Sequence, residues 1–109
     1  MRGGTLKDWI TIQQAGNVKD ELGQPIPGWP DLDSMWADIR FLSGLEASRA
    51  DAPVSIVKAS IRIRRRTDVL ANMRAVDDEG RIYDIKAVLP NKQNRQYIDL
   101  VCESGSNSG

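Results

Sequence analysis

Residues 57–64, Val-Lys-Ala-Ser-Ile-Arg-Ile-Arg, alternate strictly between apolar and polar side chains. Successive side chains of an extended strand point to opposite faces, so the apolar residues of this segment share one face and the polar residues share the other. The segment therefore predicts a strand with one face on a hydrophobic core and the other toward water or a partner.

Other segments carry weaker strand signals, and turn-forming residues separate them. The expected strands are residues 6–13, 34–41, 73–76, 81–89 and 97–103, and the expected turns are residues 20–23, 77–80 and 91–94. Proline cannot donate to a sheet ladder, so Pro25, Pro27 and Pro30 indicate an edge strand or a loop. This pattern predicts an all-β, mainly antiparallel fold, either a small barrel or a sandwich.

One short helix is expected within this β fold. Ser43-Gly44-Leu45-Glu46 has the form of a capping box, and Pro53 marks the latest point at which the helix can end. The helix, residues 44–52, falls below the ~12–15 residues at which isolated helices become marginal in water, and it offers little apolar surface. We therefore expect it to form only against something outside the core of its own monomer.

The length of 109 residues allows one modest core, so we expect one domain, residues 1–103, with residues 43–54 as an insertion and residues 104–109 as a flexible polar tail. A single cysteine forms no internal disulfide, and we see neither an apolar leader nor a run that could span a bilayer. These features predict a soluble, cytosolic chain that binds no membrane.

Charge is balanced overall but divided along the chain. There are 15 basic and 15 acidic residues, with 5 basic and 8 acidic up to Pro53 and 10 basic and 7 acidic after it. Zero net charge excludes a generally basic protein that coats nucleic acid. The opposite charges of the two parts suit head-to-tail contacts between copies.

The residue types needed for most catalysis and metal binding are missing. The chain has no histidine, and Cys102 falls on the apolar face of an expected strand, where a thiol packs as a small hydrophobe. Residues 77–79, Asp-Asp-Glu, lack the spacing of a calcium loop, and we see no glycine-rich phosphate loop. We therefore expect a protein that is not an enzyme and that holds no metal or cofactor.

One cluster of side chains stands out as a candidate contact surface. Alternate residues of a strand lie ~6.8 Å apart on one face, which places basic side chains in a row that continues past the end of the strand. The cluster either keeps an exposed strand soluble or contacts phosphates or an acidic partner, including a neighbouring copy. Its members are Lys58, Arg62, Arg64, Arg65 and Arg66.

Three tryptophans are many for so small a chain. The default expectation is that they anchor the core, because a buried indole contributes a large apolar area, and the alternative is that they anchor an interface. Trp29 lies among prolines in an expected loop and is the candidate anchor of an interface.

The order of several short motifs resembles that of the head-tail joining proteins of long-tailed bacteriophages, also called head-closure or stopper proteins. The resemblance extends over about residues 5–103, and its motifs are residues 9–13, 20–23, 36–39, 42–46, 61–64, 72–76, 80–85 and 100–103. The chain departs from that pattern in its proline-rich loop and in the acidic turn at residues 77–80.

The resemblance implies a small β-barrel that assembles as a ring beneath the portal and its adaptor, at the neck of the virion, after assembly in the host cytoplasm. Such a ring retains the packaged DNA and offers a docking surface to the tail proteins. A segment between two strands faces the channel in that family. Its counterparts here are Ser43, Gly44, Leu45, Glu46, Ser48, Arg49 and Asp51.

Two other functions remain open. A tail-terminator protein has a related barrel and ring and meets the opposite side of the same junction. A nucleic-acid-binding barrel of the OB type needs aromatic side chains on its basic face, where only Ser60 interrupts the basic residues of the expected strand.

Overall fold

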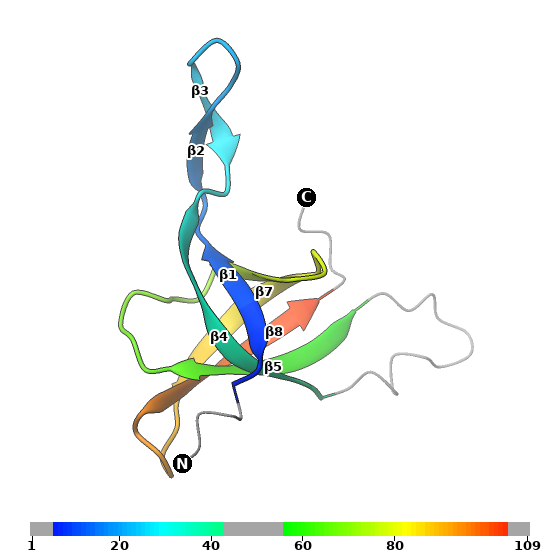
Figure 1. Cartoon of the computed structure of the whole chain (residues 1–109), viewed down its shortest axis with the longest axis vertical. Coiled ribbons are helices and arrows are strands. Elements are labelled where there is room, and N and C mark those ends of the chain that lie inside the picture. Colours follow the sequence, from blue (N-terminus) through cyan, green and yellow to red (C-terminus); the bar gives the residue numbers. More distant parts are fainter. Residues whose placement is uncertain (1–5, 43–55, 105–109) are drawn as a thin grey trace, which may run out of the picture.

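A computed structural model of the protein describes residues 6–42 and 56–104. Their regular secondary structure consists of β-strands, which confirms the all-β prediction. None of the described residues lies in a helix that could cross a membrane. The strands are β1 (Asp8–Gln13), β2 (Gly16–Lys19), β3 (Pro25–Gly28), β4 (Asp31–Phe41), β5 (Val57–Arg64), β6 (Arg74–Asp77), β7 (Ile82–Pro90) and β8 (Tyr97–Ser104) (Figure 1). The expected helix, residues 44–52, lies outside the described residues.

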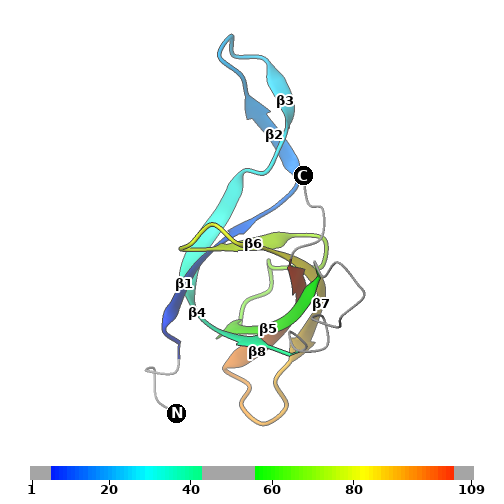
Figure 2. The ribbon, with the colours of Figure 1, turned by 90° about the vertical axis from the view of Figure 1, so that its right-hand side faces the viewer.

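Six of the strands close into an antiparallel barrel in the order β1-β4-β5-β8-β7-β6, and β1 completes the circle by pairing with β6 (Figure 2). The remaining two strands, β2 and β3, pair only with each other and project from one end of the barrel (Figure 1). Of the two predicted alternatives, the fold is therefore a barrel and not a sandwich, and it has a separate two-stranded hairpin.

The hairpin explains the prolines of this region. Pro25 and Pro27 lie in β3, opposite Lys19 and Asn17 of β2, and within the described residues the other edge of β3 pairs with no strand. A strand with one free edge tolerates residues that lack an amide donor. Of the two predicted alternatives, Pro25 and Pro27 thus lie in an edge strand, and Pro30 lies in the connection between β3 and β4.

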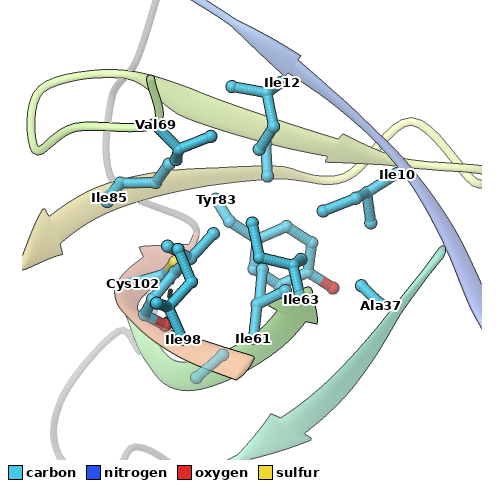
Figure 3. Close-up of a cluster of buried hydrophobic side chains, with 13 residues drawn as sticks. Ile10, Ile12, Ala37, Ile61, Ile63, Val69, Tyr83, Ile85, Ile98 and Cys102 are labelled. Atoms are coloured by element: carbon cyan, nitrogen blue, oxygen red, sulfur yellow. Dashed lines mark hydrogen bonds between the residues drawn. The ribbon is translucent and has the colours of Figure 1, made fainter. Parts of the chain in front are cut away.

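The core fills the interior of the barrel (Figure 3). The alternation of β5 places Ala59, Ile61 and Ile63 inside, where each is fully buried. Their partners on β8 are equally apolar: Ile61 lies opposite Leu100, and Ala59 opposite Cys102. The predicted apolar faces of β5 and β8 are thus confirmed, and they pack side by side in one core.

The last strand is longer than predicted. We expected Ser104 to begin the flexible tail, but it ends β8 with 1% exposure. Its hydroxyl donates a 2.9 Å hydrogen bond to the carbonyl of Ile82, so the residue completes the barrel wall instead of leaving it. Residues 105–109 lie outside the described part of the chain.

Two predicted turns are built in the same way. Asp20 accepts hydrogen bonds from the amides of Leu22 and Gln24, and Asp77 accepts them from the amides of Glu79 and Arg81, all at 2.9 Å. Each turn then uses a glycine at positive φ, 82° at Gly23 and 89° at Gly80, which glycine adopts without strain. An aspartate and a glycine three residues later thus close each hairpin.

Candidate interaction surface

The predicted channel segment can be located only by its two ends. Residues 43–55, which include every channel-loop candidate, lie outside the described residues. The amide of Leu42 donates a 2.8 Å hydrogen bond to the carbonyl of Lys58, so the chain leaves β4 and returns to β5 at neighbouring points of the barrel. The insertion therefore joins two strands that are already paired.

The basic row on β5 is largely neutralised by acidic residues on β8. Lys58 lies opposite Glu103 and Arg62 opposite Asp99. The Arg62 Nε donates a 2.9 Å hydrogen bond to the Asp99 Oδ1, and this contact raises the pKa of the guanidinium above its ordinary value. The outer face of β5 is therefore half of a mixed-charge surface.

Arg66 is also held by carboxylates. Its Nε and Nη2 donate to the two oxygens of Asp68 at 2.6 and 2.9 Å, and its Nη1 donates to Asp33 of β4 at 2.9 Å. These bonds raise the pKa of Arg66 and lower the pKa values of both aspartates. Arg66 thus pins the segment after β5 to β4 and is not available to a partner.

Two of the five basic residues differ from the others. Arg64 and Arg65 form no ion pair within the described residues, and both line an open groove of about 840 Å³. The groove runs between β1 and β4 on one side and the end of β5 with the segment that follows it on the other. Its apolar floor comes from Leu6, Trp9, Met35 and Trp36, and residues 64–68 form its other wall.

Trp9 and Trp36 do not anchor the core, so the prediction that they do is wrong. Trp9 and Trp36 are 41% and 54% exposed, and their rings meet edge to face with centroids 4.9 Å apart. They occupy opposite positions of β1 and β4. Their neighbours Ile10 and Ala37 are buried, so the alternation of each strand requires the tryptophans to point outward.

Trp29 lies at the base of the hairpin and is partly buried. The guanidinium of Arg74 stacks over its ring, 4.2 Å from the centroid, so one face of the indole is already covered. Its role as the anchor of an interface stays a prediction.

Cys102 has the environment expected of a packing residue. Its side chain is fully buried, and burial followed by the nearby charge of Asp84 raises the pKa of the thiol to about 12. Thiolate, not thiol, is the reactive form. Among residues 6–42 and 56–104 no group of side chains could hold a metal ion.

Cys102 should therefore resist alkylation in the folded protein. At pH 8 we expect maleimide labelling to be negligible in buffer and complete in a concentration of urea that unfolds the chain, as followed by mass spectrometry. Rapid labelling without denaturant would contradict the burial of this thiol in β8.

The Arg66 contacts should make a pH-dependent contribution to stability. Asp33 and Asp68 have folded-state pKa values below the ordinary 3.8, so the contribution is present above about pH 4 and disappears as the pH falls further. We expect Arg66→Gln to lower the melting temperature modestly at pH 7, because both carboxylates are exposed. The difference from the unsubstituted protein should shrink at pH 3. A constant difference would assign the effect to lost packing of the arginine.

The chain is similar to known proteins over nearly its whole length. A family model described as phage head completion protein matches residues 1–105. The solution structure of protein SF1141 from Shigella flexneri 2a has a TM-score of 0.67 and 30% identity, covering 99% of this chain and 100% of that one. A chain of the virion of a native gene transfer agent particle has a TM-score of 0.61 and 22% identity, covering 87% and 90%. No protein of curated function matches.

Proposed function

The chain belongs to the phage head completion protein family and is thus a structural protein of the phage head, and we propose that it completes the head by forming a ring that joins it to the tail. The family match over residues 1–105 carries this proposal. The ring would sit below the portal or its adaptor, close the DNA channel and present the surface to which tail proteins bind. We propose no catalytic step for it.

The surface of the barrel supports a role in assembly. The groove combines two exposed tryptophans with two arginines that form no ion pair in the described part of the chain, and aromatic and arginine side chains are enriched in protein interfaces. The hairpin extends away from the core, where it can reach another subunit (Figure 1). Two distinct contact features on one subunit favour a repeating, head-to-tail assembly.

The proposal can be tested with heads from a phage that lacks the gene for this protein. We expect these heads to package DNA but to lose it, and to carry no tails in electron micrographs. Purified protein added to filled heads should bind in several copies and restore tail attachment. Tails that attach without the protein would contradict the proposal.

The same preparation distinguishes the tail-terminator alternative. A head completion protein should bind filled, tailless heads, whereas a tail terminator should bind free tails. Sedimentation of labelled protein with each partner separately measures this preference. Binding to free tails alone would overturn the assignment to the head.

A further inference from the structure

The hairpin of β2 and β3 contributes no residue to the core cluster of the barrel. Its two strands pair only with each other, and isolated two-stranded hairpins are at best marginally stable in water. It nevertheless exposes apolar side chains: Val18 is 37% exposed, Ile26 41% and Leu22 83%. Exposed apolar residues on a projecting element indicate a surface that another molecule covers.

The tip of this hairpin carries the carboxylates of Asp20 and Glu21 beside one large apolar side chain. The Asp20 carboxylate already accepts hydrogen bonds from the amides of Leu22 and Gln24. Glu21 is exposed and forms no ion pair within the described residues, and Leu22 next to it is the most exposed of the large hydrophobic side chains described. A complementary site needs an apolar surface with a cation at its rim.

The groove beside β1 and β4 has this complementary chemistry. Trp9 and Trp36 supply an exposed aromatic surface. Arg64 and Arg65 supply two cations without carboxylate partners among the described residues, whereas Arg66 on the same wall is already paired. The open charge of the groove is therefore positive, opposite to that of the hairpin tip.

The tip of a subunit lies far from the groove of the same subunit. Trp9 is near the start of β1, and the hairpin continues from the other end of that strand (Figure 1). From Trp9 to Asp20 the chain runs roughly 11 residues in largely extended form, about 35 Å at ~3.3 Å per residue. Tip and groove are thus distinct surfaces, and a contact between them joins different subunits.

We propose that the hairpin tip of one copy binds in the groove of the next copy, with Leu22 against the Trp9–Trp36 pair and Glu21 beside Arg64 and Arg65. The proposal rests on the proposed ring, since a contact between unlike surfaces repeats around an axis and closes when the rotation allows it. The occupant of the groove is a second copy of this chain.

Cross-linking on filled heads tests the contact. Heads from a phage without this gene receive an equal mixture of Leu22→Cys protein and Thr67→Cys protein, because Thr67 is an exposed residue of the groove wall. A short bismaleimide should then produce covalent dimers that contain one chain of each kind, and the buried Cys102 should not react. The matched control replaces Thr67→Cys by Asp78→Cys, an exposed position in the turn between β6 and β7, and should give no dimers.

The outcomes separate this contact from the ring itself. Several copies on each head without cross-linked dimers, or equal cross-linking in the control, would overturn the contact and leave the proposed function intact. Failure of the unsubstituted protein to bind filled heads in several copies would overturn both.

Charge reversal provides an independent measurement. Opposing like charges at an interface are strongly unfavourable, so Glu21→Arg should reduce the copies retained on heads by about tenfold or more. The double variant Arg64→Glu, Arg65→Glu should do the same, and the combination of all three substitutions in one chain should restore retention. Glu79→Arg, in an exposed acidic turn elsewhere, should have no effect.

The same variants decide whether the groove binds nucleic acid instead. Salt-sensitive DNA binding by the purified protein that requires Arg64 and Arg65, together with normal retention of the Glu21→Arg variant, would overturn the contact between copies.

Discussion

A barrel without its hairpin should fold normally and fail to assemble. Replacing residues 16–28 by two glycines leaves a short loop between β1 and β4, which remain joined by the 3.2 Å hydrogen bond from the Gln14 amide to the Pro30 carbonyl. Because β2 and β3 contribute nothing to the buried core, the free energy of unfolding should change by less than about 1 kcal/mol. Retention on filled heads should fall more than about 30-fold, the effect of losing an interface hot spot worth 2 kcal/mol.

Urea denaturation and quantitative sedimentation with heads measure the two effects separately. Asp78→Ala, in the other aspartate-glycine turn, serves as the control and should leave retention unchanged. A variant that does not fold would show that the hairpin stabilises the barrel, and a variant that folds and assembles fully would show that the hairpin is no interface.

The core substitution Leu100→Ala should produce the largest loss of stability. Leu100 is fully buried and lies between Ile61 of β5 and Val88 of β7. Truncating such a leucine leaves a cavity in the barrel and costs about 3–5 kcal/mol, a large share of the 5–15 kcal/mol typical of a domain. Equilibrium unfolding in urea measures the change.

The matched control for this substitution is Leu22→Ala at the hairpin tip. Leu22 is 83% exposed, so its truncation should change the free energy of unfolding by no more than about 0.5 kcal/mol. A loss below about 1 kcal/mol for Leu100→Ala would mean that the interior of the barrel is not packed around this side chain.

The sequence predicts most of the barrel because its strands carry local signals. The alternation of residues 57–64 and 97–103 identifies the core face of two neighbouring strands, and each aspartate-glycine turn specifies a hairpin within a few residues. The closure of the barrel is not predicted by such local signals. It depends on the pairing of β1 with β6, which joins segments more than 60 residues apart, as in the pair Ile12 and Ala75.

The sequence predicts less of the interaction surface than of the barrel, for two reasons. The acidic partners of the arginines lie on distant segments, such as Asp99 for Arg62 and Asp33 for Arg66, so sequence alone does not tell a paired arginine from an open one. The tryptophans are a different case. The alternation around Ile10 and Ile12 places Trp9 outside, against the general expectation that a large indole is mostly buried.

The closed order of strands also bears on how proteins of this design can change. Each of the six barrel strands is paired on both sides, and the hairpin and the chain between Leu42 and Ile56 both leave the barrel at the ends of strands. Insertions and deletions at these junctions leave the pairing of the wall untouched. The hairpin and the connection between β4 and β5 can therefore lengthen, shorten or be exchanged independently, while the barrel that carries them stays the same.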